Sequence, residues 1–511
     1  MGQDDSGVFT LATQGSITFV GNVLGKALGF LFVAVATRLV SPSEYGVFTL
    51  GLSIVMFVQG FASLNIYRSV DYFVPQFLSA SNYGKAKRAL QNALSIGVIA
   101  SVFGATTLFL VRHRLATIFN EPAIASTLPF LALLIPLQTV FRTLLSSFNS
   151  LKTMRYRIIM KDFLNPLVRT LGAVVLVSTG VGLLGLVGGY FLGLTIAVVC
   201  GLIFLIYEAP WIRNVKSESV SNRALLSYSL PLVLAGVIYS LVGQIDYFVI
   251  GYFLGSADVG HYRVAYLLAG NLLIVLSAVT PVFKPMVAEN KQNTSLLESR
   301  YQLATRWITM FTFPLAITLI LAPDVYLKFL FTDEYMVAST ALVALVVGYL
   351  LNAAFGPEGM ILEGLGHTRL TLFNTFVLVG VNAGLDVLLV PRLGIFGAGI
   401  ATGSALTIAG LVGVIEIYLL RSITPISGRL LRVWSAVVPS IFAGWLVVNF
   451  GRGGLLSAIL LPLFVVFSYL FALRFTRGFS EDDHKIASRI DARIGYPVVQ
   501  FLISSSTSSK T

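Results

Sequence analysis

Long apolar runs without charged side chains constrain this chain more than any other feature. A helix needs about 20 mostly apolar residues to cross the roughly 30 Å hydrocarbon core of a bilayer. Fourteen such runs lie between polar segments, near residues 16–37, 45–66, 89–111, 126–149, 163–179, 182–207, 229–251, 261–283, 305–322, 338–356, 371–390, 394–418, 433–450 and 454–474. The sequence therefore predicts an all-α polytopic membrane protein with about fourteen transmembrane helices.

The composition excludes the main soluble classes. Hydrophobic residues make up 56% of the 511 residues and charged residues only 11%, and the mean hydropathy is +0.85. A soluble globular protein carries about 25% charged residues. A soluble enzyme and a nucleic-acid binder are therefore both excluded, and we expect no nucleic-acid partner.

The distribution of Lys and Arg predicts the orientation, because cytoplasmic loops carry an excess of these residues. With the N-terminus in the cytoplasm, the inner loops and the tail hold 25 of the 35 Lys and Arg residues. The outer loops hold six, and four lie within spans. We therefore expect a multi-pass protein of the cell membrane with both termini in the cytoplasm.

An internal repeat predicts two parallel halves. Residues 39–48 (LVSPSEYGVF) align with residues 253–262 (FLGSADVGHY) at an offset of 214, so that Gly46 matches Gly260. Both segments leave the first helix of a half and begin the second. Six intervening helices give the two copies the same orientation, which is typical of transporters whose halves are related by an axis along the membrane normal.

The expected organisation follows from these boundaries. A cytoplasmic N-terminus (1–15) precedes a first six-helix half (16–207), a cytoplasmic linker (208–228), a second six-helix half (229–418), an extra helix pair (433–474) and a cytoplasmic tail (475–511). Ser480 and Asp483 have the spacing of a capping box, and Ile486, Ile490 and Ile494 lie four apart. The tail is therefore expected to form a short amphipathic helix on the membrane surface.

Several motifs resemble a known family. They are LSYSLP (226–231), QIDYFVIG (244–251), GHYRVA (260–265), ILEGLG (361–366), Asn382, LVPRLGIFGAGIAT (389–402), and, in the first half, Gly25-Lys26, RLVSPSEYG (38–46) and the basic loop 152–161. Together they resemble the polysaccharide-biosynthesis flippases, of the O-antigen translocase type, in the multidrug/oligosaccharidyl-lipid/polysaccharide exporter superfamily. The resemblance covers roughly residues 15–420. The chain departs from many relatives at residues 63–71 (SLNIYRSVD), where they continue an apolar stretch.

The resemblance implies a fold and a function. It implies two six-helix bundles that face each other across a central cavity, with two extra C-terminal helices. It also implies alternating-access transport of polyprenyl (dolichyl) phosphate-linked sugars or oligosaccharides from the cytoplasmic to the outer leaflet, for surface polysaccharide or protein glycosylation. The expected partners are the lipid-linked glycan, membrane lipids, and glycosyltransferases or an oligosaccharyltransferase or polymerase of the same pathway.

Ionisable residues within the spans are the candidate substrate-binding residues. A charged side chain near the bilayer centre costs about 2.5–3.5 kcal/mol on insertion scales, so it normally faces a cavity or a partner. The candidates are Lys26 with Asn22 one turn away, Arg142, Arg169, Asp246 and Arg263. For each, snorkelling or a packing ion pair is the alternative. Asp386 and Glu416 lie near span ends, which favours an interfacial position for both.

The balance of these charges favours an anionic substrate. Four cations stand against one acid, Asp246, and a cationic lining offsets the desolvation of a phosphate or diphosphate group. No catalytic or metal-binding pattern is present, because the four His residues are scattered and Cys200 is the only cysteine. We therefore expect a transporter and no enzyme, without cofactor or metal.

Two other functions remain open. A cation-coupled multidrug extruder of the same superfamily would show twelve spans and an acidic cavity. An integral-membrane glycosyltransferase or ligase would need acidic catalytic residues at a membrane face and a sizeable outer domain, whereas the longest outer loop predicted here has about 15 residues.

Overall fold

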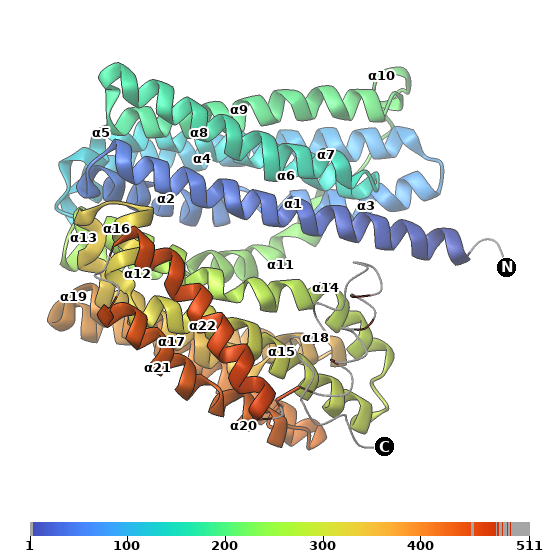
Figure 1. Ribbon diagram of the computed structural model, residues 1–511. Helices are drawn as coiled ribbons and strands as arrows, with labels where there is room; N and C mark the ends of the chain where they lie inside the picture. Colours follow the sequence, from blue (N-terminus) through green and yellow to red (C-terminus); the bar gives the residue numbers. More distant parts are fainter. Residues whose placement is uncertain are drawn as a thin grey trace. The chain divides into compact units, whose positions relative to one another are not determined.

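The computed structural model consists of helices joined by short loops, with no strand among the residues that it describes (Figure 1). It describes residues 4–450, 454–476, 478, 479, 483, 488 and 491, with their side chains from residue 21 onward except at residues 281, 282 and 455. The α-helices are α1 Asp4–Leu39, α2 Pro42–Ala62, α3 Tyr67–Ser79, α4 Tyr83–Ile118, α5 Pro122–Ala132, α6 Leu134–Ser150, α7 Met154–Ile158, α8 Asn165–Leu176, α9 Leu183–Glu208, α10 Trp211–Asn214, α11 Asn222–Leu241, α12 Ile245–Phe253, α13 Ser256–Gly270, α14 Ile274–Glu289, α15 Thr294–Leu321, α16 Pro323–Leu330, α17 Ser339–Phe355, α18 Glu358–Leu365, α19 Thr368–Arg421, α20 Gly428–Ser435, α21 Val437–Phe450 and α22 Leu455–Phe475. The π-helical turns η1 Ile159–Leu164 and η2 Val177–Val181, and the 3₁₀ turns η3 Asn271–Leu273 and η4 Asp333–Ala338, complete the described elements.

The number of membrane spans agrees with the sequence. Thirteen helical segments of the described part are long and apolar enough to cross a membrane. One of them, α19, has 54 residues and contains a non-helical residue, Gly394, at φ 61° and ψ −146°. Since about 20 residues suffice for one span, α19 supplies two spans that meet at Gly394. The predicted all-α membrane fold with about fourteen spans is therefore confirmed.

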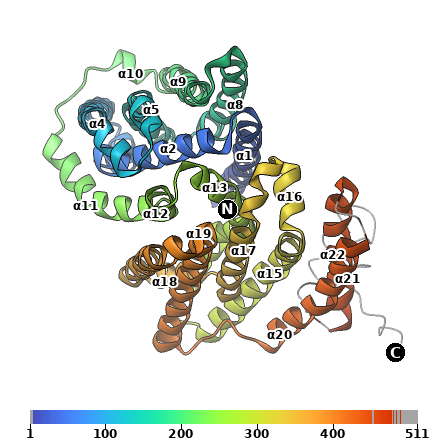
Figure 2. The same cartoon turned by 90° about the vertical axis from the view of Figure 1, so that its left-hand side faces the viewer.

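The chain divides into two compact units, residues 1–263 and 264–511. In the first unit α4 packs on α5, α6 and α3, and α9 packs on α8 and α6; Figure 2 shows several of these helices end-on. The α8–α9 contact is close because glycines lie at it: a Cβ on Gly193 would stand 2.7 Å from the carbonyl oxygen of Asn165. Small residues at such contacts let membrane helices approach closely.

The second unit has the same kind of packing. Helix α17 lies against α19 and α15, α18 lies against α14 and α19, and α21 pairs with α22. Gly348 of α17 and Gly403 of α19 lie backbone to backbone, so that neither position has room for a larger side chain. The glycines of residues 394–403 therefore include helix-packing residues, as their apolar context predicts.

The structure bears differently on three predictions: the inner loop 67–88, the boundary between the two halves and the helix of the C-terminal tail. Residues 67–88, expected as an inner loop, contain helix α3, because Val70 and Val74 lie one turn apart and are buried against α4. Helices α11 and α12, assigned by sequence to the second half, pack on α2 in the first unit, and the division into six-helix halves stays a prediction. The capping box and isoleucine stripe of the tail lie outside the described residues, except for Asp483.

Candidate functional site

Asp246 and Arg263, two of the predicted site residues, lie in one cluster of tyrosines. The Tyr262 hydroxyl donates a hydrogen bond of 2.7 Å to Oδ2 of Asp246. Arg263 donates to the Tyr247 hydroxyl at 3.0 Å and also interacts with Tyr45. Asp246 and the three tyrosines are almost completely buried. Because α12, α13 and α2 each contribute to this cluster, it ties together three helices of the first unit.

Arg169 approaches the same cluster from α8. Its positive charge acts on Tyr45, as does that of Arg263. The Arg169 guanidinium carbon lies 4.3 Å from the centre of the Phe32 ring and 4.9 Å from that of Tyr190. Such cation–π contacts keep a cation in an apolar setting without a carboxylate partner. Arg169 and Arg263, from α8 and α13, thus both act on Tyr45, and Asp246 of α12 joins the cluster through Tyr262.

Arg142 belongs to a second cluster, between α3 and α6. Its guanidinium carbon lies 5.9 Å from the centre of the Tyr67 ring, and that of Arg68 lies 5.3 Å from the same ring. Asp71, on α3, accepts hydrogen bonds from Ser146 (3.0 Å) and Asn149 (3.4 Å). Burial raises the pKa of the Asp71 carboxyl, and these hydrogen bonds oppose the shift. Two cations and one acid therefore meet here.

Lys26 and Asn22 lie on α1, with exposed side chains. The neighbouring Gly25 faces Asp162 of η1: a Cβ on Gly25 would stand 2.9 Å from the carboxylate oxygen Oδ1. The carboxylate of Asp162 is also 3.5 Å from the ammonium group of Lys161. The position of Lys26 and Asn22 in a cavity stays a prediction.

The two copies of the sequence repeat pack against each other. A Cβ on Gly46 would collide with the carbonyl oxygen of Ser256, and a Cβ on Gly260 would collide with the carbonyl oxygen of Pro42. Since Pro42 and Ser256 are equivalent in the repeat, as are the two glycines, the contacts are reciprocal. The hydroxyls of Ser43 and Ser256 are 3.0 Å apart, and Ser256 donates to Glu121 at 2.6 Å. The repeat segments therefore close on each other about a local two-fold axis.

A buried polar group in the second unit was missed by the sequence reasoning. Asn382 donates to Asp386 at 3.1 Å and to the Thr402 hydroxyl at 3.4 Å. Asp386, expected at an interface, is completely buried. Asn382 and Asp386 are one turn apart in an apolar helix, and this spacing could have predicted a buried polar pair. Among the described residues no three His, Cys, Asp or Glu side chains stand together as a metal site would require.

The sequence reasoning also missed the tyrosines around Asp246 and Arg263. Tyr262 lies in the repeat at the position that matches Phe48, and Tyr45 lies three residues before Phe48. A hydroxyl-bearing ring beside an ionisable residue in a span was the signal that could have identified them. The sequence of an apolar helix does not show, however, which of its tyrosines lies beside an ionisable residue of another helix.

These features define a multi-pass helical membrane protein with the fold of a transporter. The fold is similar to that of a solved "Lipid II flippase MurJ, inward closed conformation", with a TM-score of 0.72 at 15% identity over 90% of this chain and 99% of that one. It is also similar to an inward-facing multidrug resistance MATE family transporter of the MOP superfamily, with a TM-score of 0.62 at 15% identity over 78% of this chain and 94% of that one.

The family is shown by sequence. Residues 35–340, more than half of the chain, match the family model described as "Polysaccharide biosynthesis protein". The chain belongs to this family, and the resemblance seen in its motifs is confirmed.

Two curated relatives extend the comparison. The "Probable low-salt glycan biosynthesis flippase Agl15" of Haloferax volcanii is 23% identical over 85% of this chain and 89% of its own length. The "Teichuronic acid biosynthesis protein TuaB" of Bacillus subtilis is 25% identical over 42% of this chain, and that match spans less than half (43%) of TuaB.

Proposed function

We propose that this protein is a flippase that moves polyprenyl phosphate-linked sugars or oligosaccharides from the cytoplasmic to the outer leaflet. The observation that carries the proposal is the pair of arginine clusters in a member of a polysaccharide-biosynthesis family. Arg169 and Arg263 adjoin the buried tyrosines, and Arg142 lies beside Arg68. The name of the relative Agl15, a glycan biosynthesis flippase, supports the same substrate class.

The chemistry of these clusters suits a phosphorylated sugar. Guanidinium groups bind phosphate oxygens through paired N–H donors, and such charge-assisted bonds are stronger than neutral ones. Tyrosine hydroxyls offer the donors and acceptors that sugar hydroxyls need. In the proposed cycle the arginines replace the water that the phosphate loses on leaving the membrane surface. Transport of this kind breaks no covalent bond, so the protein acts as a transporter and not as an enzyme.

The reciprocal contact of Gly46 and Gly260 is the proposed outer gate. In the predicted orientation, residues 38–44, 112–125 and 252–260 are outer loops, and Ser43, Glu121 and Ser256 are joined by hydrogen bonds. Alternating access needs a contact that closes one end of the substrate path while the other end is open. We therefore propose that this contact closes the outer end of the path whenever it is formed.

The proposed location is the plasma membrane, with both termini in the cytoplasm, on the basis of the Lys and Arg asymmetry. Cysteine labelling in a Cys200→Ala background tests the orientation. Probes at Ser43 and Lys328 should react in intact cells. Reaction only after permeabilisation would overturn the topology. Glycosyltransferases that build the glycan, or a polymerase or oligosaccharyltransferase that consumes it, are the proposed partners.

Deletion of the gene tests the function. We expect lipid-linked saccharide to accumulate on the cytoplasmic leaflet and the surface glycan to decrease. The MATE-like fold keeps the multidrug extruder as the second candidate. Unchanged surface glycan, together with new sensitivity to cationic dyes, would favour that candidate.

A further inference from the structure

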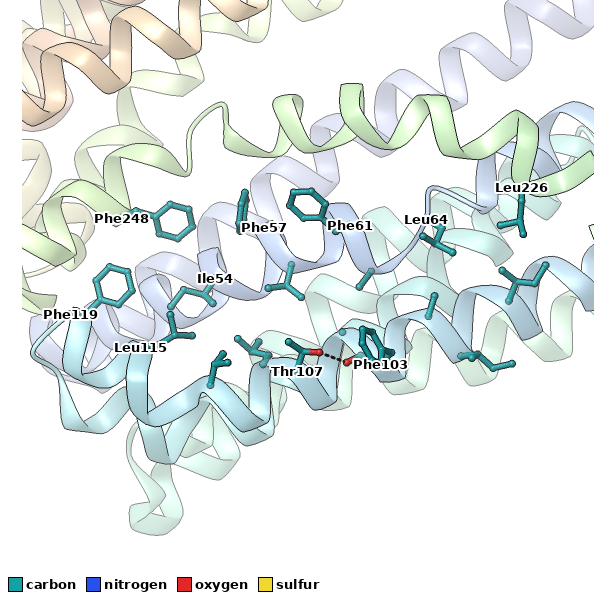
Figure 3. A pocket seen from close by; sticks show the side chains of 18 residues that line it. Ile54, Phe57, Phe61, Leu64, Phe103, Thr107, Leu115, Phe119, Leu226 and Phe248 are labelled. Carbon is teal, nitrogen blue, oxygen red and sulfur yellow. Dashed lines mark hydrogen bonds between the residues drawn. The ribbon is translucent and has the colours of Figure 1, made fainter. Parts of the chain in front are cut away.

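A long apolar groove runs along the surface of the first unit. Its volume is about 1000 Å³, at the upper end of the range of roughly 300–1,000 Å³ typical of small-molecule pockets. Helices α2, α4, α11 and α12 supply its walls, and Figure 3 shows Phe57, Phe61 and Phe248 on one side and Phe103 on the other. Ile99 and Phe103 are 71% and 75% exposed. The groove is therefore concave, aromatic and open along one side.

The groove is as long as the hydrocarbon core is thick. Its lining residues on α4 begin at Ile96, end at Leu115 and recur every three or four positions, so they form one stripe. At 1.5 Å per residue, this stripe is about 29 Å long, and the hydrocarbon core of a bilayer measures roughly 30 Å. A phospholipid acyl chain occupies one leaflet, about half of that thickness. A continuous groove through both leaflets therefore fits a longer chain, such as a polyprenyl chain.

One end of the groove adjoins the Arg68 and Arg142 cluster. Leu64, which lines the groove near Leu226 (Figure 3), precedes Tyr67 by three residues. Arg68 and Arg142 hold their guanidinium groups over the ring of Tyr67. In the predicted orientation this end lies near the cytoplasmic linker 208–228. The groove thus combines an apolar wall for a chain with cations for an anionic head at the end where the substrate starts.

The backbone between the groove and the cations is strained. Leu64 (φ 49°) and Asn65 (φ 46°) are consecutive non-glycine residues in the left-handed region, which L-residues adopt at a steric cost. The Asn65 side chain donates a hydrogen bond of 2.8 Å to the carbonyl oxygen of Leu232 on α11. This bond fixes the break between α2 and α3 against α11, and the break places Leu64 in the groove one turn before Tyr67.

We propose that the groove holds the polyprenyl chain of the substrate while Arg68 and Arg142 hold its phosphate. The proposal deepens the proposed flippase function and rests on it. The chain stays in the groove, in contact with the bilayer, and the polar head alone enters the protein. A groove that extends from one leaflet to the other lets the chain remain bound as the head changes sides.

Photolabelling tests the proposal on the full-length protein in phospholipid nanodiscs. The probe is a polyprenyl monophosphate with a diazirine near the end of its chain, and labelled positions are read by mass spectrometry. Because the phosphate is placed at the Arg68 and Arg142 end, we expect labels at the opposite end of the groove, around Ile54, Leu115 and Phe119. Unlabelled polyprenyl monophosphate should displace the probe, whereas an equal amount of phosphatidylglycerol should not. Equal displacement by both lipids would show an ordinary lipid site and overturn the proposal.

Two neighbouring threonines give a matched pair of variants. Thr107 lines the groove, and Thr106 is exposed on α4 outside it. Thr107→Trp fills the groove and should lower labelling at least fivefold, whereas Thr106→Trp should leave it unchanged. Ala100→Phe, also in the groove, should act as Thr107→Trp does. Equal labelling of all three variants would contradict the proposal.

Flipping of a fluorescent lipid-linked saccharide by the same preparations separates the two hypotheses. Flipping without labels in the groove would refute the groove as the site of the chain and leave the flippase function standing. Labels in the groove without flipping would refute the flippase function, and the groove would then be a binding site for polyprenyl phosphate alone.

Discussion

The reciprocal glycine contact yields a prediction whose magnitude follows from the structure. A Cβ on Gly46 would overlap the backbone carbonyl of Ser256, and a Cβ on Gly260 would overlap that of Pro42. Backbone atoms cannot rotate away as a side chain can, so the helices must separate. Overpacking of this kind costs about 1–3 kcal/mol, while replacing glycine by alanine inside a helix gains roughly 0.5–1 kcal/mol. The gain in helix propensity is the same whether the contact is open or closed, so only the overpacking shifts the balance between these states. We therefore expect Gly46→Ala and Gly260→Ala each to destabilise the closed state by about 1–3 kcal/mol.

Two assays measure this effect. Because 1.4 kcal/mol is a factor of about ten in population, Val259→Cys in a Cys200→Ala background should react with a thiol probe roughly tenfold faster when Gly46→Ala is added. Val259 is fully buried beside Gly260, so its reaction reports opening of the contact. The double variant should cost less than the sum of the single ones, since both methyl groups separate the same pair of helices.

Gly29 provides the control. It lies inside α1, and among the described residues no atom outside its own helical turn stands within 4 Å of where its Cβ would be. Gly29→Ala should therefore raise the Tm in detergent and leave the labelling of Val259→Cys unchanged. If Gly46→Ala and Gly260→Ala raise the Tm in the same way, the repeat contact is not tight and the proposed outer gate is refuted.

Three further predictions concern single side chains. Lys26→Ala should lower substrate affinity at least tenfold, since a lost charge-assisted contact costs about 1.5–3 kcal/mol. The control is Arg452→Ala, in a predicted outer loop, which should leave glycan export unchanged. Normal export by the Lys26→Ala variant would show that Lys26 does not belong to the substrate site. Burial raises the pKa of Glu358, the first residue of α18, from its usual 4.5 to about 7. The folded protein therefore favours the protonated carboxyl, and the stability that this group contributes is present below pH 4.5 and is lost as the pH rises through 7. Glu358→Gln should raise the Tm at pH 8 and not at pH 4.5, and equal shifts at both pH values would contradict the burial. Arg306 is 2% exposed and pairs with Asp483 at 2.9 Å, so Asp483→Ala should cost about 3–5 kcal/mol of unfolding free energy by removing the acid of a buried ion pair. A Tm unchanged by Asp483→Ala would contradict this ion pair.

The helices and their number were predictable because membrane spans are set by one physical quantity, the length of apolar chain between polar segments. The internal repeat could also be recognised in the sequence, and its two glycines, Gly46 and Gly260, lie at one contact in the structure. The helix α3 was missed because its charged residues, such as Arg68 and Asp71, read as a loop when no partner is known. In the structure Asp71 finds Ser146 and Asn149, which are distant in the sequence.

The ionisable residues of the candidate site could be predicted from the sequence, whereas the tyrosines that surround them could not. Arg169, Asp246 and Arg263 stand out as ionisable residues in apolar spans, and the structure brings them into one cluster of tyrosines. Tyrosines are common in such helices and become conspicuous only when a fold places them beside a charge. Asp386 was assigned to the membrane interface because it lies near the end of a predicted span. That position gives no information about the helices that pack over the side chain.

Transport by the purified protein tests the central claim most directly. The full-length chain is reconstituted in vesicles with a fluorescent polyprenyl diphosphate-linked saccharide, and a membrane-impermeant quencher then measures the fraction of lipid in the inner leaflet. We expect the protected fraction to fall to nearly zero in vesicles with protein, and to fall more slowly in vesicles with the Arg142→Ala variant. A protected fraction equal to that of protein-free vesicles, with uptake of a cationic dye in its place, would contradict the central claim.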